Sequence, residues 1–188
     1  MDLRISRGYK LTEEIVRWRL EILIEESDDA WISFTNPTAG PWKRLMGRDN
    51  IGTSGEVMRF AREADRPDLV IVDDKTKRIF ILEAKDDAKG LCAKEQVTKT
   101  VRTFDDLTIS LKKLRSNKYW GARSTYDFIP GLVWGSSPAE AIADEELVRR
   151  SHASRFSGLA PLFLQIIRRE SGELTVKELS KGAKLLLR

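Results

Sequence analysis

The chain has 188 residues, of which 41% are hydrophobic and 33% are charged, and its formal net charge is +4. This apolar content is enough for one folded domain over 1–188 and excludes wholesale disorder. A single cysteine and a single histidine exclude an internal disulfide framework and a metal site built from several such residues. There is no apolar run of roughly 18 residues and no signal-peptide core at the start, so we expect an intracellular, cytoplasmic protein without a membrane partner.

The first third of the chain predicts two helices, a strand and a long loop. Apolar residues spaced three and four apart indicate an amphipathic helix over 11–25, and a short apolar run over 30–34 indicates a strand. Residues 35–53 are rich in glycine and proline, which is typical of a long loop, and such loops are often functional. A second, short helix is expected over 55–64.

The most informative stretch is RPDLVIVDDKTKRIFILEAKDD, over residues 66–87. Leu69–Val72 and Ile79–Leu82 are unbroken apolar runs rich in β-branched residues, and the polar segment between them is short. This pattern predicts two buried strands joined by a tight turn.

The remainder of the chain predicts a long helix, a strand, a second helix and a β-hairpin, over residues 94–114, 128–134, 138–150, and 162–167 with 174–176. Helices that flank a small mixed β-sheet make the expected fold class α/β.

The predicted hairpin brings two carboxylates together. With its turn centred between Lys75 and Thr76, Asp68 lies opposite Glu83, and the two Cβ atoms are then roughly 4.5–5.5 Å apart. The two-residue period of a strand puts Lys85 on the same face as Glu83.

Adjacent carboxylates repel each other unless a cation lies between them, and one lysine compensates only one negative charge. Two carboxylates, the backbone carbonyl of Ala84 and water molecules are a suitable ligand set for Mg²⁺. Such an ion stabilises the charge that develops on a phosphate during hydrolysis. The alternative is structural: Asp68 as a turn residue at a strand end, and Glu83 with Lys85 as a surface ion pair.

Pro67-Asp68, fourteen intervening residues and Glu83-Ala84-Lys85 resemble the motif of the PD-(D/E)XK nuclease superfamily. The resemblance implies a restriction-endonuclease-like core, with Asp68 and Glu83 as metal ligands and Lys85 as the catalytic lysine. It also implies Mg²⁺ as the cofactor, with Mn²⁺ as a substitute. In this family a helix usually precedes three strands, and the acids belong to the second and third of these strands.

Members of the superfamily often add a carboxylate from an upstream helix. Glu56, in the predicted helix over 55–64, is the preferred candidate. The usual order of elements points instead to the helix over 11–25, where Glu14 and Glu21 are the candidates, and the choice stays open. Gln96 resembles the glutamine that follows the motif in some members.

Basic residues follow the motif and also occur in the loop over 35–53. Between residues 94 and 123 there are eight basic residues against three acidic ones, a surplus that suits contact with phosphates. The residues expected to contact DNA are Lys94, Lys99 and Arg102 after the motif, and Lys43, Arg44, Arg48 and Asn50 in the loop. The basic segment over 168–188 is a further candidate, although solvated helix faces and a plain connecting loop are the alternatives.

The resemblance implies a Mg²⁺-dependent endonuclease acting on double-stranded DNA, most similar to type II restriction enzymes. One site per chain cuts one strand, so a homodimer is expected on a palindromic duplex. Three alternatives stay open: a structure-specific Holliday-junction resolvase, a catalytically inactive nucleic-acid-binding module of the same fold, and an unrelated α/β interaction protein.

Overall fold

The computed structural model describes residues 31–35, 67–113, 115–116, 120–152, 154–156, 158–169, 171 and 173–180. The predicted helices over 11–25 and 55–64 lie outside these residues, as does the predicted loop after residue 35. None of the helices in the described ranges is long and apolar enough to cross a membrane.

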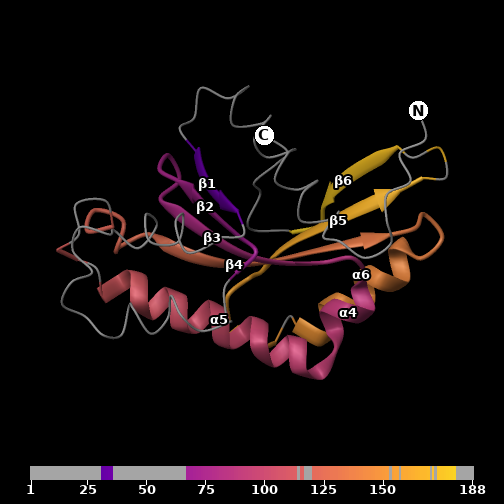
Figure 1. Ribbon diagram of the computed structural model, residues 1–188, viewed down its shortest axis with the longest axis horizontal. Coiled ribbons are helices and arrows are strands. Elements are labelled where there is room, and N and C mark those ends of the chain that lie inside the picture. The colour runs from indigo at the N-terminus through magenta and orange to yellow at the C-terminus, as the bar shows by residue number, and fades with distance from the viewer. Residues whose placement is uncertain are drawn as a thin grey trace.

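A six-stranded mixed sheet forms the centre of the fold, and its strands lie side by side in chain order (Figure 1). The pairs β3–β4 and β4–β5 are parallel, and the other three pairs are antiparallel. The strands are β1 (Trp31–Thr35), β2 (Leu69–Asp73), β3 (Arg78–Lys85), β4 (Asp127–Ser136), β5 (Leu162–Arg168) and β6 (Leu174–Glu178). The predicted α/β fold with a small mixed sheet is confirmed.

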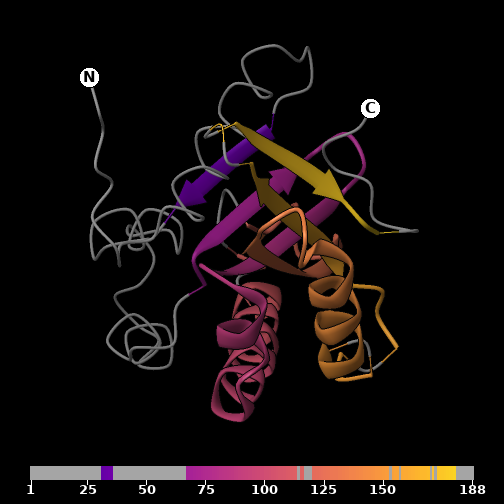
Figure 2. The same ribbon diagram turned by 90° about the vertical axis from the view of Figure 1, so that its right-hand side faces the viewer.

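Three helices occupy the two parallel crossovers. Helices α4 (Ala88–Cys92) and α5 (Lys94–Lys113) connect β3 to β4, and α6 (Ala141–His152) connects β4 to β5. Parallel crossovers are almost always right-handed, so two successive crossovers that step the same way put their helices on the same face of the sheet. Figure 2 shows α5 and α6 on that common face.

Helix α4 was not predicted, because five residues are too few for a periodic apolar pattern. The side chain of Asp87 caps its first turn by accepting a hydrogen bond from the Gly90 backbone N–H at 2.6 Å.

Both faces of the central strands are buried, which explains why their apolar runs do not alternate with polar residues. One face packs against the helices and the other contributes to a second apolar cluster. Residues on the helix face include Val70, Val72, Ile79 and Ile81, together with Phe104, Leu107 and Leu111 from α5. The opposite face includes Leu69, Ile71, Phe80 and Leu82, with Leu164 and Ile166 from β5.

The β2–β3 turn is fixed by local hydrogen bonds and by an ion pair. The Thr76 backbone N–H donates to Asp73 Oδ1 at 3.0 Å, and Lys77 adopts the left-handed backbone conformation with φ 54°. From outside the turn, Arg123 donates to Asp74 through Nε at 2.8 Å and also through Nη2. This ion pair lowers the pKa of the Asp74 carboxyl. The turn therefore holds one register of the hairpin.

Candidate active site

The register of the β2–β3 hairpin is the one predicted from the sequence. Leu69 pairs with Leu82, and the pairing continues in step to Asp73 and Arg78 at the turn. The backbone N–H of Asp68 donates to the carbonyl oxygen of Leu82 at 3.0 Å, so Asp68 and Leu69 both adjoin Leu82 at this end of the hairpin. The predicted position of Asp68 opposite Glu83 lies one residue beyond the paired ladder, and the Asp68 carboxylate reaches the end of β3 where Ala84 and Lys85 lie.

Asp68, Glu83 and Lys85 converge at this end of the hairpin. The Lys85 ammonium nitrogen lies 2.9 Å from Glu83 Oε1 and 3.8 Å from Asp68 Oδ2. It also donates to the backbone carbonyl oxygen of Ala84 at 3.0 Å. Asp68 Oδ2 in turn accepts a hydrogen bond from the Ala84 backbone N–H at 2.8 Å. The structure thus brings together the three side chains that the motif singles out and the Ala84 backbone between Glu83 and Lys85.

Helix α5 supplies a second donor to Glu83. Gln96 Nε2 donates to Glu83 Oε1 at 2.8 Å and to Thr100 Oγ1 at 3.1 Å. The Thr100 hydroxyl donates to the Gln96 backbone carbonyl at 2.8 Å, which ties the two residues together one helical turn apart. The sequence singled out Gln96 but not Thr100, whose only signal is its spacing of four from Gln96 on the same helix face.

The Glu83 carboxyl is much less exposed than its partners. The exposed fraction of the side chain is 5% for Glu83, 15% for Asp68 and 32% for Lys85. Burial raises the pKa of the Glu83 carboxyl, and the neighbouring Asp68 carboxylate raises it further. The positive charges of Lys85 and Lys99 act in the opposite direction on this pKa. The two acidic side chains therefore lie where little water is present. In such a low-dielectric position, a carboxylate attracts a bound cation most strongly.

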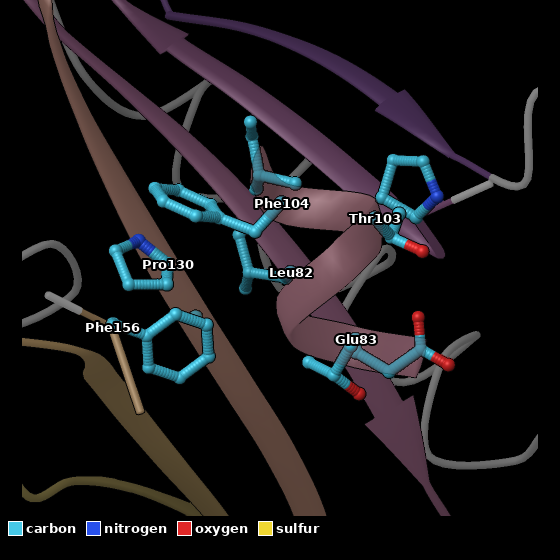
Figure 3. Close-up of a pocket in the computed structure, with 10 residues that line it drawn as sticks. Leu82, Glu83, Thr103, Phe104, Pro130 and Phe156 are labelled. Carbon is cyan, nitrogen blue, oxygen red and sulfur yellow. The ribbon is translucent and has the colours of Figure 1, made fainter. Parts of the chain in front are cut away.

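A small pocket lies behind Glu83, between the sheet and α5 (Figure 3). Its volume is about 10 Å³, measured as the space open to the centre of a water molecule, which is enough for one water. The Thr103 hydroxyl lines it and is buried with no hydrogen-bond partner in the part of the chain that the structure describes. Nothing larger than water fits in this pocket, and Lys85 is the most exposed of the three side chains at the site.

The donor atoms present suit a hard divalent cation. Two carboxylates and one backbone carbonyl lie within 3.8 Å of a single atom, the Lys85 nitrogen. Mg²⁺ is usually held by one or two carboxylates, with water and substrate phosphate completing its shell. Within the described ranges, no three His, Cys, Asp or Glu side chains come together as a metal site. The protein oxygens available to a cation at this site would be those of the two carboxylates and the Ala84 backbone carbonyl.

The predicted DNA-contacting residues of α5 do not share one surface. Lys99 is close enough to Glu83 to affect its pKa, whereas Lys94 and Arg102 line a different groove, with Cys92, Ser151 and Arg155. The reason is the helical period of about 3.6 residues per turn, which places residues 94 and 102 together on another face than Gln96 and Thr100. Lys99 is therefore the one of these three cations that acts on the Glu83 carboxyl, while Lys94 and Arg102 lie along the other groove, and their contact with DNA stays a prediction.

The remaining candidates, Glu14, Glu21, Glu56, Lys43, Arg44, Arg48 and Asn50, lie outside the described residues.

His152 is far in sequence from the motif and is fully buried. Its Nε2 lies 3.1 Å from the Leu91 carbonyl oxygen, and its ring stacks on Phe156 with centroids 6.4 Å apart. Burial lowers the pKa of this imidazole, so the neutral form is favoured. These contacts give His152 a structural role between α4 and α6.

No family model, curated protein or solved structure matches the chain. The functional interpretation therefore depends on the geometry of the site and on the motif.

Proposed function

We propose that the chain is a Mg²⁺-dependent endonuclease that hydrolyses phosphodiester bonds in double-stranded DNA. The observation that carries the proposal is the convergence of Asp68, Glu83, Lys85 and the Ala84 carbonyl at one end of a buried hairpin. Further support comes from the order of the elements. Asp68 directly precedes β2 and Glu83 belongs to β3, as the resemblance to PD-(D/E)XK nucleases implies.

Each residue has a separate task in this proposal. Asp68 and Glu83 hold the ion, with Asp68 oriented by the Ala84 N–H and Glu83 oriented by Gln96. The Lys85 ammonium is the most exposed group of the three, so it is placed to offset the charge of a phosphate at the entrance. A bound Mg²⁺ supplies Lewis-acid stabilisation of the charge that builds up on the phosphate.

More specifically, we propose that the chain is a type II restriction enzyme that acts in the cytoplasm as a homodimer. One Asp68–Glu83 site per chain cuts one strand, so cleavage of both strands at a palindrome requires two chains. A homodimer also matches the two-fold symmetry of such a duplex.

The test is digestion of plasmid DNA by the full chain with Mg²⁺. We expect discrete fragments that are lost in EDTA and in Asp68→Asn, Glu83→Gln and Lys85→Met. The matched control is Asp127→Asn, because Asp127 is exposed and lies five residues along β4 from Leu132, the partner of Glu83. Equal cleavage by Asp68→Asn and the wild type would contradict the proposal.

The same assay separates the alternatives. Sequencing of the fragment ends reports a recognition sequence if the enzyme is of the restriction type. Cleavage of a four-way junction without sequence preference, and none of linear duplex, would indicate a resolvase. DNA binding without any cleavage would indicate an inactive module.

A further inference from the structure

The Lys85 ammonium contacts the same oxygens that a metal ion would need. Its nitrogen lies 2.9 Å from Glu83 Oε1, 3.0 Å from the Ala84 carbonyl oxygen and 3.8 Å from Asp68 Oδ2. These three atoms are the complete set of protein ligands that the proposed function assigns to Mg²⁺ within the described residues.

Two cations cannot occupy this position together. Mg²⁺ requires oxygen atoms at about 2.0–2.1 Å in a near-octahedral arrangement, so an ion bound to these oxygens would lie where the ammonium now is. Like charges at that separation also repel strongly in a partly buried site. Conversely, without any cation the Asp68 and Glu83 carboxylates would face each other uncompensated, with Glu83 almost completely buried.

We propose that the Lys85 ammonium takes the place of the metal ion in the metal-free protein, and that a divalent cation binds by displacing it toward the entrance of the site. The proposal depends on the proposed function, because it uses the same ligand set. It adds an exchange step: the side chain that stabilises the metal-free pair is released by the ion and becomes available to a substrate phosphate. Metal binding would thus prepare the lysine for its task.

The first experiment follows the lysine itself in the wild-type chain, without DNA. Reductive methylation, quantified by mass spectrometry of peptides, measures how accessible each amine is with and without Mg²⁺. We expect Lys85 to react slowly in EDTA and about tenfold faster with saturating Mg²⁺, as hydrogen bonds to charged groups are lost. Lys89, which is exposed on α4, is the internal control and should react at the same rate in both conditions. An unchanged or slower rate for Lys85 with Mg²⁺ would overturn the proposal.

The second experiment measures Mn²⁺ affinity by electron paramagnetic resonance. Lys85→Met removes the competing ammonium but keeps the length of the side chain, so we expect Mn²⁺ to bind about ten- to a hundredfold more tightly. Lys99→Met is the matched control, since Lys99 acts on Glu83 through its charge. Its effect should be about fivefold at most. Equal affinities in Lys85→Met and the wild type, or weaker binding in the variant, would overturn the exchange.

The two experiments separate failure of this inference from failure of the proposed function. If the wild type cleaves DNA with Mg²⁺ but Lys85 does not become more reactive, the exchange is wrong and the nuclease assignment stands. If neither the wild type nor Lys85→Met binds Mn²⁺, both are wrong. The methylation experiment needs no variant, so it decides the question even if Lys85→Met does not fold.

Discussion

The close contact between β3 and β4 beside the site can be tested by adding one methyl group at Gly131. Gly131 pairs with Leu82, and a Cβ atom at position 131 would lie 2.6 Å from Leu82 Cγ. Carbon atoms normally approach to about 3.5–4.0 Å, so Leu82 must move by about 1 Å in Gly131→Ala. Leu82 is only 1% exposed and packs in the second apolar cluster, so it has little room to move.

Overpacking of this kind costs about 1–3 kcal/mol of the free energy of unfolding. Because Leu82 directly precedes Glu83, its displacement should also move the Glu83 carboxyl. A shift of about 1 Å at a reacting group can lower a rate on the order of a hundredfold. Urea unfolding of the metal-free chain measures the first effect, and the rate of plasmid cleavage by Gly131→Ala measures the second.

The control is the double variant Gly131→Ala with Leu82→Ala. Leu82→Ala removes the atoms that clash and on its own should cost about 2–5 kcal/mol by leaving a cavity. In the double variant the new methyl group occupies part of that cavity, so the losses should sum to less than the two single effects. Additive losses, or a Gly131→Ala chain as stable as the wild type, would refute the argument from close contact.

Three further predictions concern other contacts. Gln96→Leu removes the amide donor to Glu83 and should lower the cleavage rate at saturating Mg²⁺ about tenfold or more; an unchanged rate would show that Gln96 does not orient the carboxylate. Burial lowers the pKa of His152 below 6.5, so the stability contributed by its neutral imidazole is complete above that pH and is lost as the pH falls. The urea midpoints measured at low and at neutral pH should therefore differ less in His152→Gln than in the wild type. Arg123→Met removes the ion pair with Asp74, which is partly exposed, so thermal unfolding should show a loss of about 1 kcal/mol at most. Plasmid digestion should show the same cleavage rate as the wild type.

The hairpin and its register were predictable from the sequence because the information is local. Two apolar runs of equal length flank a short polar segment, and only one symmetric turn aligns them, which brings Asp68 and Glu83 to the same end of the hairpin. The strands and long helices of the described region were predictable for a similar reason, since their apolar periods extend over many residues.

The surroundings of the pair depend on contacts between distant segments and could not be predicted in the same way. The approach of α5 to β3, which brings Gln96 and Thr100 to Glu83, follows from the packing of a crossover. The pairing of Gly131 with Leu82 depends on β4, almost fifty residues away. A surplus of basic residues along α5 also did not reveal that Lys94 and Lys99 lie on different faces of the helix.

The most direct test of the central claim is a crystal of the metal-free protein soaked in Mn²⁺ and measured at the manganese absorption edge. We expect one anomalous peak within coordination distance of Asp68, Glu83 and the Ala84 carbonyl oxygen, with the Lys85 ammonium moved away from these atoms. A peak elsewhere in a chain that cleaves DNA would contradict it, as would a peak at this site with the Lys85 ammonium still in contact with the same three oxygens.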